Sequence, residues 1–195
     1  MKHKRQIILF ILTMILITIG CSACFGGDSS TPADVRSPLA LYTITQNEDG
    51  TYTYQVVDRN GSVLYSQSLA AREPTAAQVS DHVVGLTVQA GTGLSTNWAV
   101  YCDVENSRVS DIFQYVLLAQ GDYVLFVNYE NGEYSIIVQN IFDKSAYYKK
   151  HVLADCAPVA ADVVTGAKQN GEGIAVVTYL TGEDYKETAL TISFP

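Results

Sequence analysis

The sequence predicts an antiparallel, all-β domain of four repeated hairpin units, arranged like the blades of a β-propeller. A β-sandwich or barrel is the alternative. Three observations lead to this fold class. From residue 39 onward, hydrophobic residues recur with a period of two, as in strands with one buried face. Paired segments of this kind are separated by turns that contain glycine. The pairs recur about every 40–50 residues, which is a spacing typical of propeller blades.

Each unit is expected to contain a strand, a tight turn and a second strand. The four hairpins pair residues 41–45 with 51–57, 83–88 with 97–102, 123–127 with 134–138, and 174–179 with 188–192. Their turns contain Gly50, Gly93, Gly132 and Gly182. Glycine allows the positive φ angles that tight hairpin turns require. The pattern therefore predicts four small sheets within residues 39–195.

A further strand is expected after each of the first three hairpins. These extended segments are residues 62–67, 108–113 and 147–153, and an acidic residue precedes each of them, at Asp58, Asp103 and Asp143. Pro74 and Pro158 lie between the units, where proline removes no hydrogen bond from a sheet. No long helix is expected, and a single helical turn is considered only for residues 76–81.

The first twenty residues have the layout of a secretory signal. Lys2, Lys4 and Arg5 precede an apolar run of 13 residues at 7–19. A helix of that length is about 20 Å long, too short to cross a hydrocarbon core of roughly 30 Å comfortably. The segment Thr18-Ile19-Gly20-Cys21-Ser22 resembles a bacterial lipoprotein signal, although Thr18 stands where Leu, Val or Ile is preferred.

That resemblance implies that Cys21 becomes the first residue of the mature protein and carries a diacylglyceryl group. It implies attachment to a cell membrane on its extracytoplasmic face. The expected organisation is a signal peptide at 1–20, a flexible polar tether at 21–38, and one all-β domain at 39–195. Two alternatives remain open at this stage: lipidation at Cys24, and an uncleaved N-terminal anchor.

The charge of the chain restricts its partners. The protein has 12 Lys and Arg residues and 20 Asp and Glu residues, for a net charge of −8. Removing the signal removes three basic residues and no acidic one, which makes the net charge −11. Such a surface opposes binding to nucleic acids and to anionic lipid surfaces.

Parts of the domain resemble uncharacterised lipoproteins of Gram-positive, Clostridia-like bacteria. The stretches that carry this resemblance are 101–106, 109–113, 140–145 with 147–149, and 179–185. The resemblance implies the outer face of a plasma membrane rather than an outer membrane. It implies no activity and no catalytic residues.

Two cysteines lie within the domain, at Cys102 and Cys156. An exported protein can form disulfides, so these two thiols could pair. The loop they would close, of about 54 residues, would contribute about 4 kcal/mol in the chain-entropy view. Two independent thiols are the alternative. Neither cysteine belongs to a Cys-x-x-Cys motif, which argues against zinc and against thioredoxin-like redox chemistry.

No catalytic constellation is visible in the sequence. Ser80, Asp81 and His82 have the residue types of a catalytic triad, but residues adjacent in sequence cannot face one another across a nucleophile. The acidic turns at 47–50 and 103–106 offer oxygen ligands that suit calcium, yet they follow no calcium-loop pattern and match ordinary turn chemistry. No catalytic residue, metal site or cofactor is therefore expected.

These features predict a lipid-anchored, non-catalytic binding module for a protein, a peptide or a cell-envelope glycan. Its ligand-binding residues cannot be named from the sequence. Two other functions are kept as alternatives: a glycan or peptide hydrolase whose acidic residues come from distant segments, and a structural subunit of an envelope complex. A pair of buried carboxylates, one with a raised pKa, would favour the hydrolase.

Overall fold

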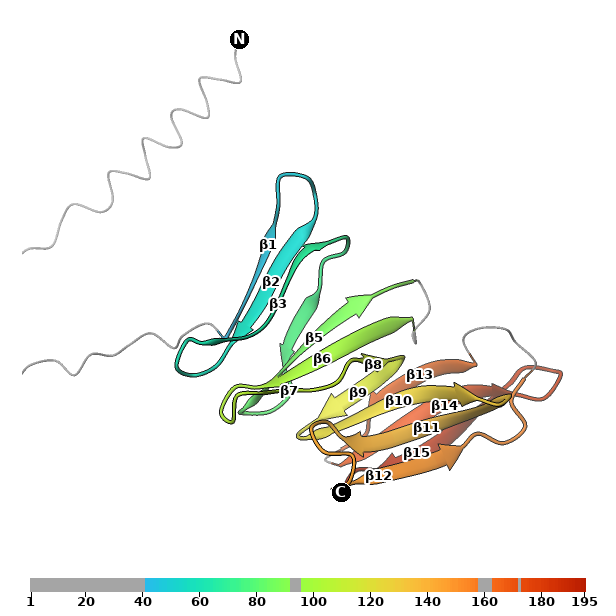
Figure 1. Cartoon of the computed structure of the whole chain (residues 1–195). Coiled ribbons are helices and arrows are strands. Elements are labelled where there is room, and N and C mark those ends of the chain that lie inside the picture. Colours follow the sequence, from blue (N-terminus) through green and yellow to red (C-terminus); the bar gives the residue numbers. More distant parts are fainter. Residues whose placement is uncertain (1–40, 92–95, 158–162, 172) are drawn as a thin grey trace, which may run out of the picture. The chain divides into compact units, whose positions relative to one another are not determined.

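The computed structural model describes residues 41–91, 96–157, 163–171 and 173–195. The contacts divide the chain into two units between Ser37 and Pro38, and all described residues lie in the second unit. This described part contains strands and no helix, and every strand pairing in it is antiparallel (Figure 1). The all-β fold class is therefore confirmed.

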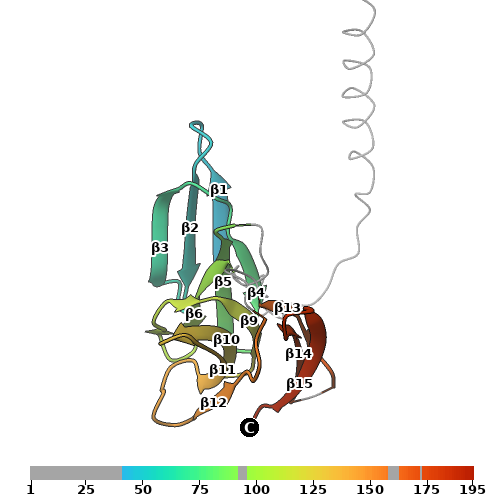
Figure 2. The same ribbon diagram turned by 90° about the vertical axis from the view of Figure 1, so that its right-hand side faces the viewer.

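The strands form four sheets that follow one another along the chain (Figures 1 and 2). The first contains β1 (Tyr42–Gln46), β2 (Tyr52–Val57) and β3 (Val63–Ala70). The second contains β4 (Thr75–Gln78), β5 (Val83–Gln89), β6 (Asn97–Asp103) and β7 (Arg108–Val109), with β8 (Phe113–Gln114) paired to β6. The third contains β9 (Val116–Gln120), β10 (Tyr123–Glu130), β11 (Glu133–Asn140) and β12 (Tyr148–Val152). The fourth contains β13 (Val164–Gln169), β14 (Ile174–Thr181) and β15 (Lys186–Ser193).

All four predicted hairpins are present, as β1–β2, β5–β6, β10–β11 and β14–β15. The predicted third strands are present as β3, the short pair β7 and β8, and β12. Gly50 and Gly132 have φ angles of 81° and 85°, as their turns require. Gly93 and Pro158 lie outside the described residues.

The helical turn considered for residues 76–81 is wrong. Residues 75–78 form β4, which pairs with β5 through partners such as Ala76 and Leu86. A four-residue segment has almost no helical stability of its own, because the first helical turn is costly to form. The edge of β5 offers it hydrogen bonds instead, so tertiary pairing decides its structure.

In each of the first three sheets, the second strand of the predicted hairpin (β2, β6 or β11) leads into a turn that a carboxylate or carboxamide closes. Asp58 accepts hydrogen bonds from the backbone N–H groups of residues 60 and 62, and Asp103 accepts them from residues 105 and 106. Asn140 accepts them from residues 142 and 143. The third sheet therefore has Asn140 at this position. Asp143, which the sequence spacing indicated instead, accepts hydrogen bonds from the backbone and hydroxyl of Ser145. Asn and Asp are interchangeable in such turns.

Three hydrophobic clusters lie between successive sheets. The first joins the first and second sheets, the second joins the second and third, and the third joins the third and fourth. Strand alternation makes this possible, since Val84 and Leu86 of β5 belong to the first cluster while Val83 belongs to the second. In the described residues, no strand of the first sheet pairs with the fourth, and no closed ring or barrel is formed.

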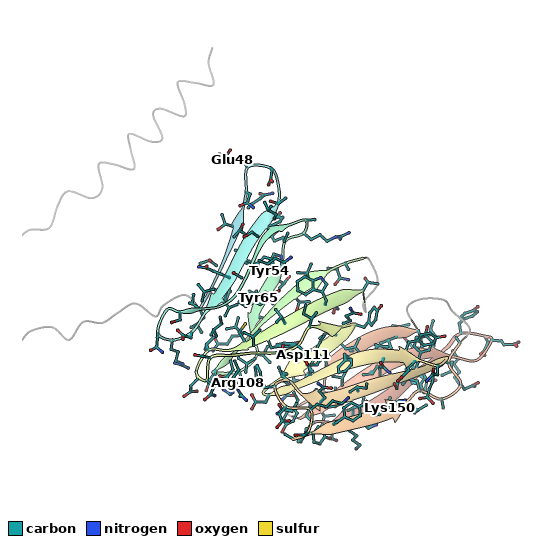
Figure 3. The ribbon with its side chains drawn as sticks, viewed as in Figure 1. Glu48, Tyr54, Tyr65, Arg108, Asp111 and Lys150 are labelled. Carbon is teal, nitrogen blue, oxygen red and sulfur yellow. The ribbon has the colours of Figure 1, made fainter. Side chains whose placement is uncertain are left out.

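Three of the four tyrosines of the first sheet belong to the first cluster or pack against it, whereas Tyr42 is exposed. Tyr54 has no exposed surface, and its hydroxyl lies 2.7 Å from Oε1 of Gln67, to which it donates a hydrogen bond. The Tyr65 ring lies 6.4 Å from the Tyr54 ring, measured between centroids (Figure 3). Burial raises the pKa of Tyr54 to about 12, so it stays a neutral hydrogen-bond donor.

Candidate functional site: an uncharged cavity lined by carboxamides

A cavity of about 690 Å³ lies among strands of the second, third and fourth sheets. Its walls come from β4, β5, β6, β9 and β13, and its described lining residues include no charged side chain. Five of them carry a carboxamide: Gln78, Gln89, Asn97, Gln120 and Gln169. The rest of the wall is mostly apolar, with residues such as Val116 and Leu118. Cavities that bind small molecules have volumes of roughly 300–1,000 Å³ and combine apolar walls with a few polar groups.

Gly85 and Tyr101 form one wall of the cavity. They are partners in the β5–β6 register, and the Tyr101 side chain is almost fully buried. A Cβ atom on residue 85 would lie only 2.9 Å from Cε1 of Tyr101, so only glycine lets the ring pack against the β5 backbone. Burial also raises the pKa of Tyr101, which keeps its phenol neutral.

Asn97 joins the second sheet to the third at the edge of this cavity. Its Nδ2 donates a hydrogen bond of 2.8 Å to the carbonyl oxygen of Val116, and its Oδ1 accepts one of 2.9 Å from the Val116 N–H. The side chain thus forms hydrogen bonds with both the N–H and the carbonyl of Val116, as the backbone of a neighbouring strand would. This pair of bonds places the start of β9 beside β6.

Gln120, at the end of β9, differs from Asn97 in that its side-chain oxygen is not hydrogen-bonded. Its Oε1 is buried and has no hydrogen-bond partner in the structure. An unsatisfied buried acceptor costs about 1–3 kcal/mol. Gln120 also lines the cavity, but this oxygen exposes almost no surface, so a ligand would reach it only after the side chain turns.

The two fully satisfied carboxylates of the core do not have the properties of a catalytic acid. Asp103 has no exposed surface, and Asp58 is 5% exposed. Burial by itself raises the pKa of Asp103, but hydrogen bonds from Arg108, Asn106 and the backbone of Glu105 outweigh it and bring the pKa to about 2. The pKa of Asp58 is also lowered, chiefly by the Ser62 N–H. A general acid needs a raised pKa, so this pair does not supply the feature that would favour the hydrolase.

His82 has a partner that sequence adjacency did not indicate. Its Nε2 lies 3.0 Å from Oδ1 of Asp122, while its Nδ1 lies 3.4 Å from Oγ of Ser80. The carboxylate comes from the β9–β10 turn and not from the neighbouring Asp81. The Ser80–His82 contact is long and local, and all three residues are partly exposed. The arrangement joins the β4–β5 turn to the third sheet.

Both acidic turns use their oxygens within the turn. Oδ1 of Asp49 accepts bonds from the backbone and hydroxyl of Thr51, at 3.0 and 2.6 Å. The Asp103 carboxylate accepts hydrogen bonds from the backbone N–H groups of residues 105 and 106 and from the Arg108 side chain. Within the described ranges, no three His, Cys, Asp or Glu side chains form a group that could hold a metal ion.

The two cysteines of the domain are free thiols in the structure and belong to different clusters. Cys102 is buried in the first cluster, whereas Cys156 packs against the third. Burial raises the pKa of the Cys102 thiol to about 12, which makes it unreactive. The Cys102–Cys156 disulfide is therefore not formed in this structure. Cys21 lies outside the described residues.

The cavity residues were not found from the sequence. Gln78, Gln120 and Gln169 lie at the ends of three different strands and belong to no motif. Only the packing of three sheets shows that they line one space.

Comparison of the chain with protein-family models, with curated proteins and with solved structures finds no match. In the part of the chain that the structure describes, no helix is long and apolar enough to cross a membrane.

Proposed function

We propose that this protein is a lipid-anchored binding module on the extracytoplasmic face of a cell membrane, and that its cavity binds an uncharged stretch of a cell-envelope glycan. The observation that carries the ligand class is the cavity with its five carboxamides and no charged lining residue among those described. Carboxamides both donate and accept hydrogen bonds, which matches the hydroxyl and acetamido groups of neutral sugars. A charged ligand would lose its hydration there without gaining a counter-ion.

The order of strands supports a propeller-like arrangement around this cavity. β4, β9 and β13 are each the first strand of a meander, and all three contribute lining residues. In a propeller, the first strand of each blade lines the central channel. The proposed site would then lie where the first strands of successive blades meet.

The binding proposal is tested with the full chain, purified in a detergent without a sugar headgroup so that the detergent cannot compete. Calorimetric titration would use neutral tetrasaccharides of glucose and of N-acetylglucosamine, with a charged uronic-acid tetrasaccharide as comparison. We expect at least one neutral sugar to bind with a Kd below about 1 mM, which corresponds to about −4 kcal/mol, and the charged sugar not to bind. Absence of binding by every neutral sugar would overturn the proposal.

Gln120→Leu separates binding from stability. Leucine removes the unsatisfied acceptor and keeps a similar volume, so the free energy of unfolding should stay the same or rise by up to about 1 kcal/mol. The same change removes a carboxamide from the cavity wall, and sugar affinity should fall about tenfold, or about 1.4 kcal/mol. Calorimetry and urea unfolding measure the two effects.

The matched control for this variant is Gln55→Leu. Gln55 is also a partly buried strand glutamine, but it lies on β2 and does not line the cavity. It should leave sugar affinity unchanged. Equal affinities for wild type and the Gln120 variant would remove Gln120 from the site.

The anchor is tested separately, at Cys21. Cys21→Ala should prevent acylation and move the protein from the membrane fraction to the soluble or secreted fraction, because stable attachment needs the two acyl chains that a diacylglyceryl group supplies. Cys24→Ala is the control and should leave the protein with the membranes. Retention of the Cys21 variant in an unprocessed, membrane-bound form would instead indicate an uncleaved anchor.

A further inference from the structure

A second hollow adjoins the cavity at the start of β6. This cleft has a volume of about 400 Å³ and includes Trp98, Gln114 and Tyr115 in its lining. Asn97, the first residue of β6, lines both the cleft and the cavity, so the two spaces lie next to each other at that end of the strand. The cleft also has no charged residue among its described lining residues. Two of its lining residues are aromatic: Tyr115 is exposed, and Trp98 is partly buried against the first cluster.

The cleft depends on an unusual backbone at Tyr115. Trp98 and Gln114 are partners in the β6–β8 register, so their side chains lie on the same face. In a regular strand the next residue, Tyr115, would point to the opposite face. Its φ angle is instead 57°, in the left-handed region, and Tyr115 lines the same cleft as Gln114.

The surrounding sheets hold Tyr115 in this conformation. Its N–H donates a hydrogen bond of 2.8 Å to the Asn97 carbonyl, and its own carbonyl accepts one of 2.9 Å from the N–H of Val127. The side chain is nevertheless 46% exposed. A left-handed backbone is costly for any residue with a Cβ, and burial of the ring compensates only in part. These contacts hold the ring at the surface, where it lines the cleft.

We infer that the cleft is a second sugar subsite, in which one ring of the glycan chain packs against Tyr115 and Trp98 while the next part of the chain enters the cavity past Asn97. The inference rests on the proposed function and extends it, because it makes the ligand an oligosaccharide rather than a single sugar. The apolar face of a pyranose ring suits an aromatic side chain, and Gln114 is placed to bond its hydroxyl groups.

The test uses Tyr115→Gly in the full chain. Glycine adopts a left-handed backbone without strain and keeps both main-chain hydrogen bonds, so the variant should fold with an unchanged or slightly higher melting temperature. Loss of the ring should weaken tetrasaccharide binding about tenfold. In the variant, the tetrasaccharide should bind no more tightly than the disaccharide of the same sugar.

Tyr185→Gly is the matched control. Tyr185 has a φ angle of 55° and is 50% exposed, so its backbone and its exposure are close to those of Tyr115. It lies in the β14–β15 turn and lines neither hollow. The Tyr185 variant should show the same change in melting temperature and full tetrasaccharide affinity.

The possible outcomes are distinguishable. If no neutral sugar binds the wild type, the proposed function fails and this inference fails with it. If wild type and Tyr115→Gly bind the tetrasaccharide equally, the second subsite is overturned while the proposed function stands. A loss of affinity together with a melting temperature well below that of Tyr185→Gly would assign Tyr115 a structural role. Tyr115-dependent binding of a neutral acetylated peptide, with no binding of sugars, would overturn the glycan as ligand.

Discussion

Replacing Asp103 with alanine is expected to lower the free energy of unfolding by about 3 kcal/mol at pH 7. The carboxylate has no exposed surface and accepts bonds from two backbone N–H groups and from the side chains of Asn106 and Arg108. Alanine leaves these donors without their acceptor at the end of β6. Urea unfolding followed by tryptophan fluorescence measures the loss, since Trp98 lies on the same strand.

The loss should depend on pH in a specific direction. The folded-state pKa of Asp103 is about 2, below its ordinary value of 3.8. A carboxyl whose pKa is lower in the folded state stabilises the fold above its unfolded pKa, and this stability disappears as the pH falls through the folded value. The difference between wild type and Asp103→Ala should therefore narrow by about 2 kcal/mol between pH 5 and pH 2.

Asp111→Ala is the control for both measurements. Asp111 is exposed and lies only two residues beyond β7 (Figure 3). Its replacement should change the free energy of unfolding by less than about 0.5 kcal/mol at any pH. A constant difference between wild type and Asp103→Ala from pH 7 to pH 2 would contradict the assigned role of the ionised carboxylate.

Asn97→Leu is expected to have a similarly large effect, with a loss of about 3 kcal/mol. Leucine has nearly the same size, but it leaves both the N–H and the carbonyl of buried Val116 without a partner between the second and third sheets. Each unsatisfied group costs about 1–3 kcal/mol. The amide of Val116 should also exchange its hydrogen with solvent much faster than in wild type.

Asn128→Leu, a change at a partly buried asparagine on β10, provides the comparison. It should leave the exchange of the Val116 amide unchanged. Slow exchange at Val116 in the Asn97 variant would show that the two sheets stay joined without this carboxamide.

The hairpins could be predicted because the information for them is local. In residues 123–138, two short hydrophobic runs flank Gly132, and these features suffice to place β10 and β11. The same reasoning failed where a short segment had no strong preference. Residues 75–78 became a strand only because β5 offered them a sheet edge.

The turn after the second strand of each hairpin shows a further limit of the sequence-based prediction. The sequence spacing indicated a repeated acidic residue, and Asp58 and Asp103 do close equivalent turns. In the third sheet the same position holds Asn140, whose side chain makes the same bonds. A pattern of residue types cannot identify this equivalence, since it follows from hydrogen-bond geometry.

The amino-acid sequence alone was enough to establish the four hairpins and the all-β class, because a period of two and a turn glycine act over about fifteen residues. It did not predict β4, β9 or β13. The stacking of the sheets, the shared cavity and the aromatic cleft depended on tertiary structure. Inner strands such as β5 and β6 bury both faces, and alternation does not say which face meets which sheet. Gln120 and Tyr115 gain their roles only from contacts between segments far apart in the chain, where the space left after packing decides which polar atoms face a ligand.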